Sequence, residues 1–428
     1  MFSLRTKWSI LRALLTGKSP YYIQFYLTGR CHLRCRQCNI VEANSACREL
    51  SLDEIAVVAD NIRRIGGGIV LLTGGEPFLR KDVDQVAAIF IQRGLDVRLQ
   101  TAGLASDEQL RRCYDIGVRD INISLDSLDG DKQDYINAVS GSWGDAIDAI
   151  ERVSRIFRGD SAICSLGCVL SRFNYREIPA ILEFATSIGW YLSLVPVHIT
   201  SPQAFRAFRS YDSDFTFRPE DIPELRRVIE RVIAAKRNGQ MLFDSESYLR
   251  SIIHFAETGR PTWRRGGVCD CPDLYFVVRP NGEFAPCCDY FLDSALSLAD
   301  PNFWRAYKSG EISRLVAPIK AKCEGCHYGS FPEVTLSVRD LKAFLQRAWL
   351  VLGRTRQIIK PIEQGALVGL AESIRKQFPE AYGAGALAAD LAERVAKWGS
   401  SEGQMELVQE DRYRRMREQR VRQTSRGR

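Results

Sequence analysis

Three cysteines, Cys31, Cys35 and Cys38, fall within the eight-residue stretch CHLRCRQC. Four thiolates at suitable spacing would suggest a structural zinc ion or a fully ligated iron–sulfur cluster. Three thiolates in one loop leave one coordination position for a small ligand, as catalytic metal sites do. The residues alone therefore leave two sites open: a cluster with one free iron, or a zinc ion completed by His32 or a distant residue.

A second group of cysteines lies in the C-terminal half, in CDCPDLYFVVRPNGEFAPCC and CEGC. Its members are Cys269, Cys271, Cys287, Cys288, Cys323 and Cys326. The longer stretch is typical of a β-hairpin with Asn281-Gly282 at its turn. A structural zinc ion at CEGC is the alternative to a cluster. The other cysteines, Cys47, Cys113, Cys164 and Cys168, lack such spacing and are interpreted as small core residues.

The chain between about residues 22 and 200 alternates apolar, β-rich runs with amphipathic segments. Strands are predicted at 21–29, 69–75, 97–103, 119–126, 163–170 and 191–197. Helices are predicted at about 51–67, 81–94, 106–117, 142–157 and 175–189. Near-continuous apolar strands separated by amphipathic helices indicate a parallel sheet covered by helices. Six such units fit the α/β class and a partial (β/α)6, TIM-like barrel.

The motifs that could do chemistry all follow predicted strands. Cys31 follows the first strand, TGGEP (73–77) ends the second, QTAG (100–103) ends the third and SLD (124–126) ends the fourth. Ligands of such barrels collect at the carboxyl ends of the strands. We therefore expect these motifs to meet at one rim.

Cys31-x3-Cys35-x2-Cys38 after a first strand, with GGEP after a second, resembles the radical S-adenosylmethionine (radical SAM) enzymes over roughly residues 20–200. The resemblance implies a [4Fe–4S] cluster on the three cysteines, with its fourth iron chelating the methionine moiety of S-adenosylmethionine. An electron, supplied by a reducing partner such as flavodoxin or ferredoxin, would cleave the sulfonium. The resulting 5′-deoxyadenosyl radical would abstract hydrogen from a substrate.

The same resemblance implies cofactor contacts from the GGEP turn. Gly74 and Gly75 would let the backbone approach the methionine amine. Glu76 would accept a hydrogen bond from that ammonium group, and Pro77 would hold the turn.

Other cofactor contacts are implied at the strand ends. Ser124 matches a family position near the cofactor's carboxylate or ribose, whereas Thr101 and Ser171 are weaker candidates that a plain strand-end hydroxyl explains as well. The family commonly has an aromatic residue just before the third cysteine, and here it is Gln37. Val195 is the candidate to pack the adenine instead. No catalytic residue is assigned.

The C-terminal cysteines resemble the auxiliary-cluster extension, called SPASM, of one branch of these enzymes. The full extension has further cysteines after CxxC, where this chain has Pro332 and Leu336. The resemblance is therefore to the shortened (twitch) form, which carries one additional [4Fe–4S] cluster. The preferred ligands are Cys269, Cys287, Cys323 and Cys326. Cys271 and Cys288 are their competitors.

The formal charge of +7 is concentrated at the two ends. Residues 412–428 hold eight arginines and one glutamate, and residues 1–21 hold four basic residues and no acid. The remaining body is slightly acidic, which argues against a nucleic-acid partner. Since no signal peptide or membrane-spanning run is found, we predict a cytoplasmic protein whose thirteen cysteines are reduced thiols or metal ligands.

The N-terminal segment places large apolar residues among these basic ones. Two interpretations stay open: peripheral contact with a membrane surface, or packing on the chain's own domain. The predicted organisation is a basic amphipathic segment (1–21), a radical SAM barrel (22–200), a helical connection (201–268), an auxiliary-cluster domain (269–335), a helical extension (336–400) and a charged, disordered tail (401–428).

The expected function is that of a radical SAM enzyme of oxidoreductase or transferase type. Its substrate is predicted to be a small molecule, a sugar or a lipid-linked compound, changed by a net oxidation or rearrangement. Neither a cobalamin-binding domain nor a winged-helix module for precursor peptides is expected before the first strand. A maturase of ribosomally made peptides is therefore the alternative, and a non-catalytic zinc-binding interaction protein is a third, less favoured one.

Overall fold

A computed structural model of the chain describes residues 2–44, 47–160, 162–197, 213–263, 269–288, 290, 292, 296–323, 325–352, 357–383 and 385–399. Six parallel strands follow one another as predicted, each paired with the next. They are β1 (Tyr22–Thr28), β2 (Ile69–Gly74), β3 (Asp96–Thr101), β4 (Asp120–Ser124), β5 (Ile163–Leu170) and β6 (Tyr191–Pro196). The predicted partial barrel is confirmed.

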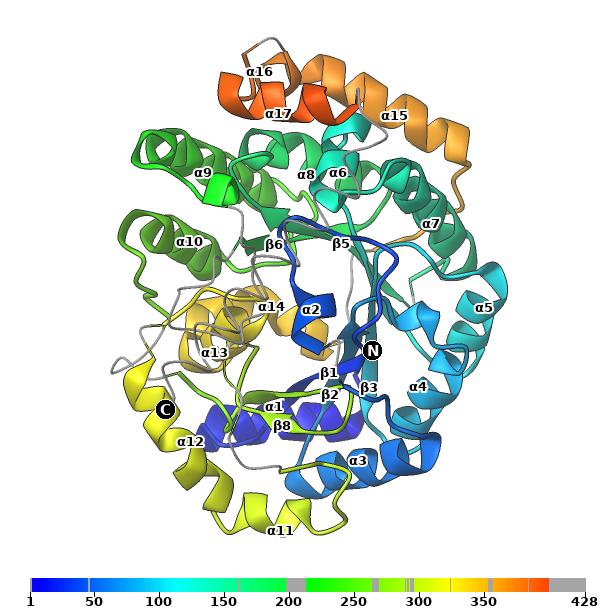
Figure 1. The fold of residues 1–428 in the computed structure, drawn as a ribbon, viewed down its shortest axis with the longest axis vertical. Helices are drawn as coiled ribbons and strands as arrows, with labels where there is room; N and C mark the ends of the chain where they lie inside the picture. Colours follow the sequence, from blue (N-terminus) through cyan, green and yellow to red (C-terminus); the bar gives the residue numbers. More distant parts are fainter. Residues whose placement is uncertain are drawn as a thin grey trace, which may run out of the picture.

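The expected helices lie on the outside of this curved sheet (Figure 1). They are α3 (Leu52–Ile65), α4 (Val83–Ile91), α5 (Asp107–Asp115), α7 (Ser142–Ile156) and α8 (Ile178–Ser187). In α3, Ser51 and Glu54 form a capping box, and the apolar face that includes Ile55, Val58 and Ile62 is fully buried. Two short helices were not predicted: α2 (Ile40–Asn44) and α6 (Gly130–Asn137).

The predicted hairpin is confirmed, with β7 (Tyr275–Val278) antiparallel to β8 (Phe284–Ala285) and Gly282 at φ 83° in the turn. Its position was not predicted. Strand β7 pairs in parallel with β1, with Tyr22 opposite Tyr275, so that the hairpin extends the barrel sheet in the order β6-β5-β4-β3-β2-β1-β7-β8. This pairing places the C-terminal cysteines beside the first barrel strand.

The remaining described segments are mostly helical. They are α1 (Leu4–Thr16), α9 (Ile222–Arg237), α10 (Glu246–Thr258), α11 (Phe303–Lys308), α12 (Glu311–Lys322), α13 (Phe331–Arg339), α14 (Leu341–Leu352), α15 (Gln364–Gln377), α16 (Pro379–Tyr382) and α17 (Ala389–Gly399). The predicted tail at 401–428 lies outside the described residues. None of the helices described is long and apolar enough to cross a membrane.

Helix α1 packs against the amino-terminal ends of the barrel strands. The Ser3 backbone N–H donates to Asp96 Oδ2 (2.9 Å), at the start of β3. The Thr6 hydroxyl donates to the Gly68 carbonyl (2.9 Å) and the Ser9 hydroxyl to the Gly66 carbonyl (2.6 Å), both just before β2. One side of this segment therefore packs on its own domain, and this packing does not test contact of the other side with a membrane.

Candidate functional site

The loop after β1 and the turn after β2 are joined backbone to backbone. The Gly75 N–H donates to the Thr28 carbonyl (2.9 Å) and the Glu76 N–H to the Arg30 carbonyl (2.8 Å). A Cβ atom on Gly75 would lie 2.0 Å from the Arg30 carbonyl oxygen and 3.1 Å from Cys31 Cβ. Only glycine permits this approach, which brings the GGEP turn directly against the first cysteine.

The carboxylate of Glu76 is fully buried at the same rim. It accepts hydrogen bonds from the backbone N–H groups of Phe78 (3.1 Å) and Ala102 (2.8 Å) and from the Thr101 hydroxyl (2.9 Å). Burial raises the pKa of Glu76 to about 7, and these three donors oppose that rise. Glu76 therefore ties the end of β2 to the end of β3.

Thr101→Val should lower the free energy of unfolding by about 1–3 kcal/mol, because the buried Glu76 carboxylate loses a donor. The Thr101 hydroxyl also accepts from the Gly103 N–H (3.0 Å), and this group would be left unpaired. Urea denaturation measures the effect. The matched control is Thr258→Val, whose hydroxyl bonds the His254 carbonyl on an exposed helix end. Weaker S-adenosylmethionine binding without loss of stability would instead make Thr101 a ligand contact.

The cysteine loop is held by α6, an element that the sequence analysis missed. Backbone N–H groups of Arg34 and Arg36 donate to the carbonyls of Asn137 (3.1 Å) and Ile136 (2.9 Å). The Cys35 thiol donates to Asn137 Oδ1 (3.3 Å). Asn137 lies 102 positions after Cys35 and belongs to no motif, so the sequence does not indicate this role.

The three cysteines of this loop are half-buried, and their chemistry suits an iron–sulfur cluster. The Cys38 N–H donates to the Cys35 carbonyl (3.1 Å), closing a turn that carries the last two sulfurs. Burial raises the pKa of the Cys31 thiol to about 12, and the neighbouring Cys38 adds to that rise. Such a thiol becomes a thiolate when a metal replaces its proton.

Gln37 stands where the family commonly has an aromatic residue. Its side-chain amide donates to Asp126 Oδ2 (2.7 Å), which ties the cysteine loop to the end of β4. Asp126 also accepts from the Val169 N–H (2.6 Å), and burial raises its pKa to about 7. The sequence predicts SLD as a strand end, and nothing in it indicates this structural role of Asp126.

The other predicted cofactor residues divide by position. Ser124 and Val195 are half-buried and both line the cavity inside the barrel. Ser171 is fully buried, and its hydroxyl and N–H both contact Asn174 Oδ1, at 3.3 and 2.8 Å. A local turn accounts for Ser171, whereas Ser124 and Val195 face open space.

The six C-terminal cysteines fall into two groups by burial. Cys269, Cys287, Cys323 and Cys326, the preferred ligands, are half-buried, whereas the two competitors are fully buried. Burial raises the pKa of Cys287 well above its usual value, and the neighbouring Cys288, Cys269 and Cys323 raise it further. Residues distant in the sequence therefore gather around Cys287.

The two buried competitors have contacts of their own. Cys288 donates to Gln24 Oε1 (3.3 Å) and accepts from the Tyr26 hydroxyl (3.0 Å), both on β1. Cys271 Sγ lies 3.2 Å from Cys269 Sγ. Cys288 is thus tied to the barrel, while Cys271 stays within reach of the ligand set.

The described residues do not bring three His, Cys, Asp or Glu side chains together as ligands of one metal ion. In a cluster each cysteine binds a different iron, so its ligands need not meet at one point. Three of the remaining cysteines, Cys113, Cys164 and Cys168, are buried in the core as predicted. Cys47 differs, because it is half-buried and its sulfur accepts from the Arg279 guanidinium (3.1 Å).

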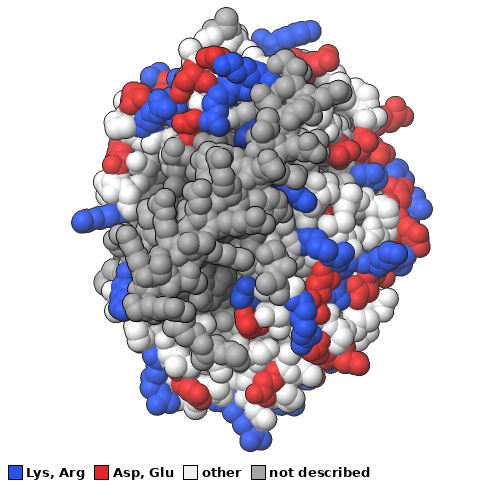
Figure 2. Space-filling model, in the orientation of Figure 1, with Lys and Arg blue, Asp and Glu red and all other residues white. Residues whose placement is uncertain are grey.

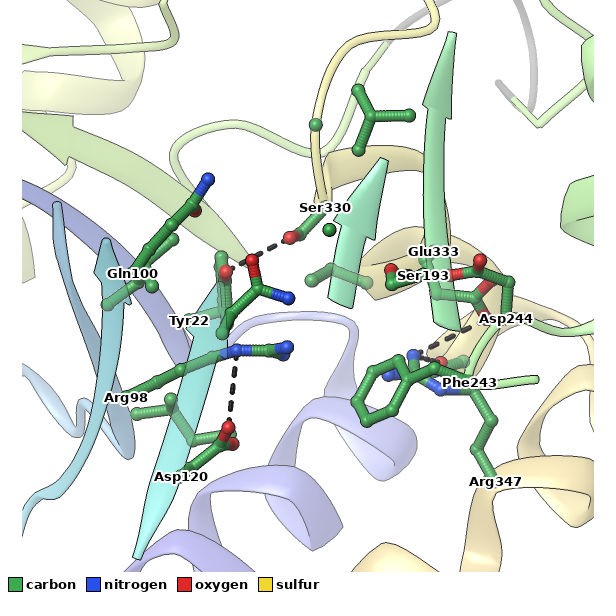
Figure 3. Close-up of a pocket in the computed structure, with 18 of the residues that line it drawn as sticks. Tyr22, Arg98, Gln100, Asp120, Ser193, Phe243, Asp244, Ser330, Glu333 and Arg347 are labelled. Atoms are coloured by element: carbon green, nitrogen blue, oxygen red, sulfur yellow. Dashed lines mark hydrogen bonds and ion pairs between the residues drawn. The ribbon is translucent and has the colours of Figure 1, made fainter. Parts of the chain in front are cut away.

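A cavity of about 170 Å³ lies inside the barrel (Figure 3). Its lining includes Arg98 and Gln100 from β3, Asp120 and Asn122 from β4, and Ser193 from β6. The interior of a closed TIM barrel is normally packed with bulky branched side chains. Hydrogen-bonding groups around open space indicate a binding cavity instead.

Charged groups of both signs face this cavity. Arg98 pairs with Asp120 (3.4 Å) and Arg347 with Glu333 (3.4 Å), and all four side chains are largely buried. The neighbouring Asp244 accepts from the Ser193 hydroxyl, and burial raises its pKa to about 7. These charged residues were not predicted from the sequence, because Asp244, Glu333 and Arg347 come from outside the six predicted strands.

The rim face has no single sign of charge. Figure 2 shows lysine and arginine interspersed with aspartate and glutamate around the described part of this face. The described part therefore lacks the continuous basic stripe that is typical of nucleic-acid-binding surfaces.

Comparisons with known proteins relate the barrel to one superfamily. A model of the "Radical SAM superfamily" matches residues 25–185. A "GTP 3′,8-cyclase" of Rhizobium leguminosarum bv. trifolii is 32% identical over 190 residues, covering 42% of this chain and 52% of that protein. An "AdoMet-dependent heme synthase" of Methanosarcina barkeri is 29% identical over 173 residues, covering 40% and 48%. The chain spans about half the length of these two curated relatives.

The fold has a similar solved structure as well. SuiB of Streptococcus suis, bound to the precursor peptide SuiA, superposes with a TM-score of 0.52 at 13% identity. The match covers 70% of this chain and 68% of SuiB, and so extends beyond residues 25–185. At this identity the likeness concerns the fold.

Proposed function

Since residues 25–185 match the radical SAM superfamily, we propose that this chain cleaves S-adenosylmethionine reductively and abstracts hydrogen from a polar small molecule held in the barrel cavity. The match confirms two predictions made from the sequence. One is the superfamily, and the other is the pair of cofactor classes, a [4Fe–4S] cluster and S-adenosylmethionine. When bound, they would supply the one-electron cleavage that yields the 5′-deoxyadenosyl radical. The residues discussed next would bind and orient these groups.

The observation that carries the proposal is the junction between the cysteine loop and the GGEP turn. Gly75 lies against Cys31, and the two hydrogen bonds between the segments fix their relative position. A cluster on Cys31, Cys35 and Cys38 would therefore lie beside the turn that is proposed to bind the methionine amine. Glu76 would orient this turn through its contacts with β3.

The polar cavity supports the choice of substrate class. Buried guanidinium and carboxylate groups are costly unless they are paired or meet a polar ligand. Arg98 and Asp120 line a cavity that also reaches Ser124, at the rim end of β4. Since Leu71, Leu194 and Phe243 also line the cavity, a small molecule that combines apolar surface with several hydrogen-bonding groups fits this lining.

A peptide maturase remains the second candidate, because SuiB shares the fold and its solved complex contains a precursor peptide. The paired charged groups that line the cavity favour the small molecule. The predicted second [4Fe–4S] cluster is proposed on Cys269, Cys287, Cys323 and Cys326. Its location beside β1 supports a role as electron relay or structural support.

Anaerobically reconstituted protein should bind about eight irons, four for each cluster. With dithionite and S-adenosylmethionine it should form 5′-deoxyadenosine, and a polar metabolite pool should accelerate this more than a peptide pool does. Iron analysis and chromatography of deoxyadenosine measure both results. Protein without dithionite is the control.

Two results would contradict the proposal. Zinc in place of iron after strictly anaerobic preparation would support the structural zinc alternative. Acceleration by peptides alone would exclude the small molecule in favour of the maturase.

A further inference from the structure

Helix α1 exposes four of its large apolar side chains, and three of its four buried residues are small or polar. The buried residues are Thr6, Ser9, Ile10 and Ala13. Leu4, Trp8, Leu11 and Leu15 are 79%, 69%, 41% and 77% exposed. Their spacing of i, i+4, i+7 and i+11 places them in one stripe along the helix. A surface helix of a globular protein normally has the opposite arrangement.

Helix α14 has a similar arrangement. Leu341, Leu345 and Leu352 are 73%, 62% and 66% exposed and occupy positions i, i+4 and i+11. The inward side carries Ala343, which is fully buried, and Arg347, which pairs with Glu333. Two helices far apart in the sequence therefore each present a leucine stripe to solvent.

The start of α1 lies near the end of α14, and the end of α1 lies near the start of α14. Phe2, just before α1, packs against the cluster of Tyr191 and Phe243, as does Trp349 near the end of α14. At the other end, a Cβ atom on Gly17, just after α1, would lie 3.1 Å from the guanidinium of Arg339, just before α14. Both helices also line the cavity, α1 through Ile10 and α14 through Phe344 and Arg347. We call their exposed leucines and Trp8 the two-helix face.

The charge around the two-helix face is positive. Arg5, Lys7 and Arg12 lie on α1 and Lys18 follows it, whereas neither α1 nor α14 contains an acidic residue. Acids on neighbouring segments contact the two helices: Asp96 accepts from the Ser3 N–H and Asp340 from the Lys342 N–H. Glu246 pairs with the Lys342 ammonium group of α14 (3.4 Å). An apolar stripe flanked by basic residues is suited to the headgroup region of an anionic bilayer.

From these observations we propose that the two-helix face docks on anionic lipid membranes. Leu4, Trp8, Leu11 and Leu15 would enter the interface together with the leucines of α14. Lys7 and Arg12 would extend to the lipid phosphates while their apolar stems cover the same interface. The bilayer would then lie against the amino-terminal ends of the strands, opposite the cysteine loop.

The test uses the full chain and sedimentation with vesicles of phosphatidylcholine, alone or mixed with phosphatidylglycerol. The wild-type chain should bind the mixed vesicles, and raising the salt concentration should weaken the binding. Trp8→Gln combined with Leu345→Gln should lower the partition coefficient by about tenfold or more, as expected when two apolar side chains leave the interface. Both residues are exposed, so the fold and deoxyadenosine formation should be unchanged.

Leu315→Gln on α12 is the matched control, because Leu315 is an exposed leucine (40%) outside the two-helix face. It should bind vesicles as the wild-type chain does. The proposal is wrong if Leu315→Gln loses as much vesicle binding as the double variant, or if the wild-type chain does not bind the mixed vesicles. A wild-type dimer in light scattering that the double variant abolishes would also overturn it, because the face would then join two copies of the chain. None of these outcomes depends on radical chemistry.

Discussion

Cys35→Ala should abolish 5′-deoxyadenosine formation while leaving about half of the iron in the protein, since each [4Fe–4S] cluster holds four irons. The variant removes one of the three thiolates that the proposed cluster requires. The remaining iron would be held by the C-terminal cysteines, which the substitution does not touch. Iron analysis and a deoxyadenosine assay on the same sample measure both effects.

Cys47→Ala is the matched control for this variant. Cys47 is half-buried like Cys35, and its sulfur contacts Arg279 and Asn44 rather than the cysteine loop. It should retain all of the iron and the full rate. Deoxyadenosine formation by Cys35→Ala would show that the N-terminal site is misassigned.

The double variant Cys323→Ala, Cys326→Ala should have the reverse effect. Iron should again fall by about half, because one cluster loses two of its four ligands. Deoxyadenosine formation with dithionite should continue, since the loop at Cys31 is intact. Formation of an oxidised product should stop if the C-terminal cluster accepts the electron that remains on the substrate after hydrogen abstraction. That electron would pass to the cluster as the substrate radical loses a proton.

The single variants Cys271→Ala and Cys288→Ala are the controls that test the ligand set. Cys288 is occupied by Gln24 and Tyr26, and its replacement should leave the iron content unchanged. The sulfurs of Cys269 and Cys271 are 3.2 Å apart, so either could bind the cluster. Loss of iron in Cys271→Ala would show that Cys271 is the ligand in place of Cys269. Normal substrate oxidation by the double variant would rule out the relay and leave a structural role.

The barrel could be predicted because its signals are local. Each strand is a short apolar run, and the turn at Gly75 and the hairpin turn at Gly282 follow from glycines at particular positions. The order of the motifs along the chain then placed Cys31 and Glu76 at one rim. Hydrogen bonds between the two loops show the same arrangement.

The features that were missed depend on contacts between distant segments. The pairing of β7 with β1 joins residues about 250 positions apart, and short apolar strands carry little information about their partners. Asn137 and Asp126 gain their roles only in the folded chain, where Asn137 contacts Cys35 and Asp126 contacts Gln37 of the cysteine loop. The polar cavity combines side chains from strands and from α13 and α14, and no single stretch of sequence contains it.

The pairing of β7 with β1 also affects how the barrel can fold during synthesis. The first six strands are complete when residue 196 has been made, yet β1 then has an open edge, with the backbone of Tyr22–Phe25 unpaired on one side. Unpaired strand edges promote association with other chains. The barrel gains its covering strand only after about 80 further residues have been translated. The ribosome-bound intermediate is therefore the stage at which this chain most needs a chaperone.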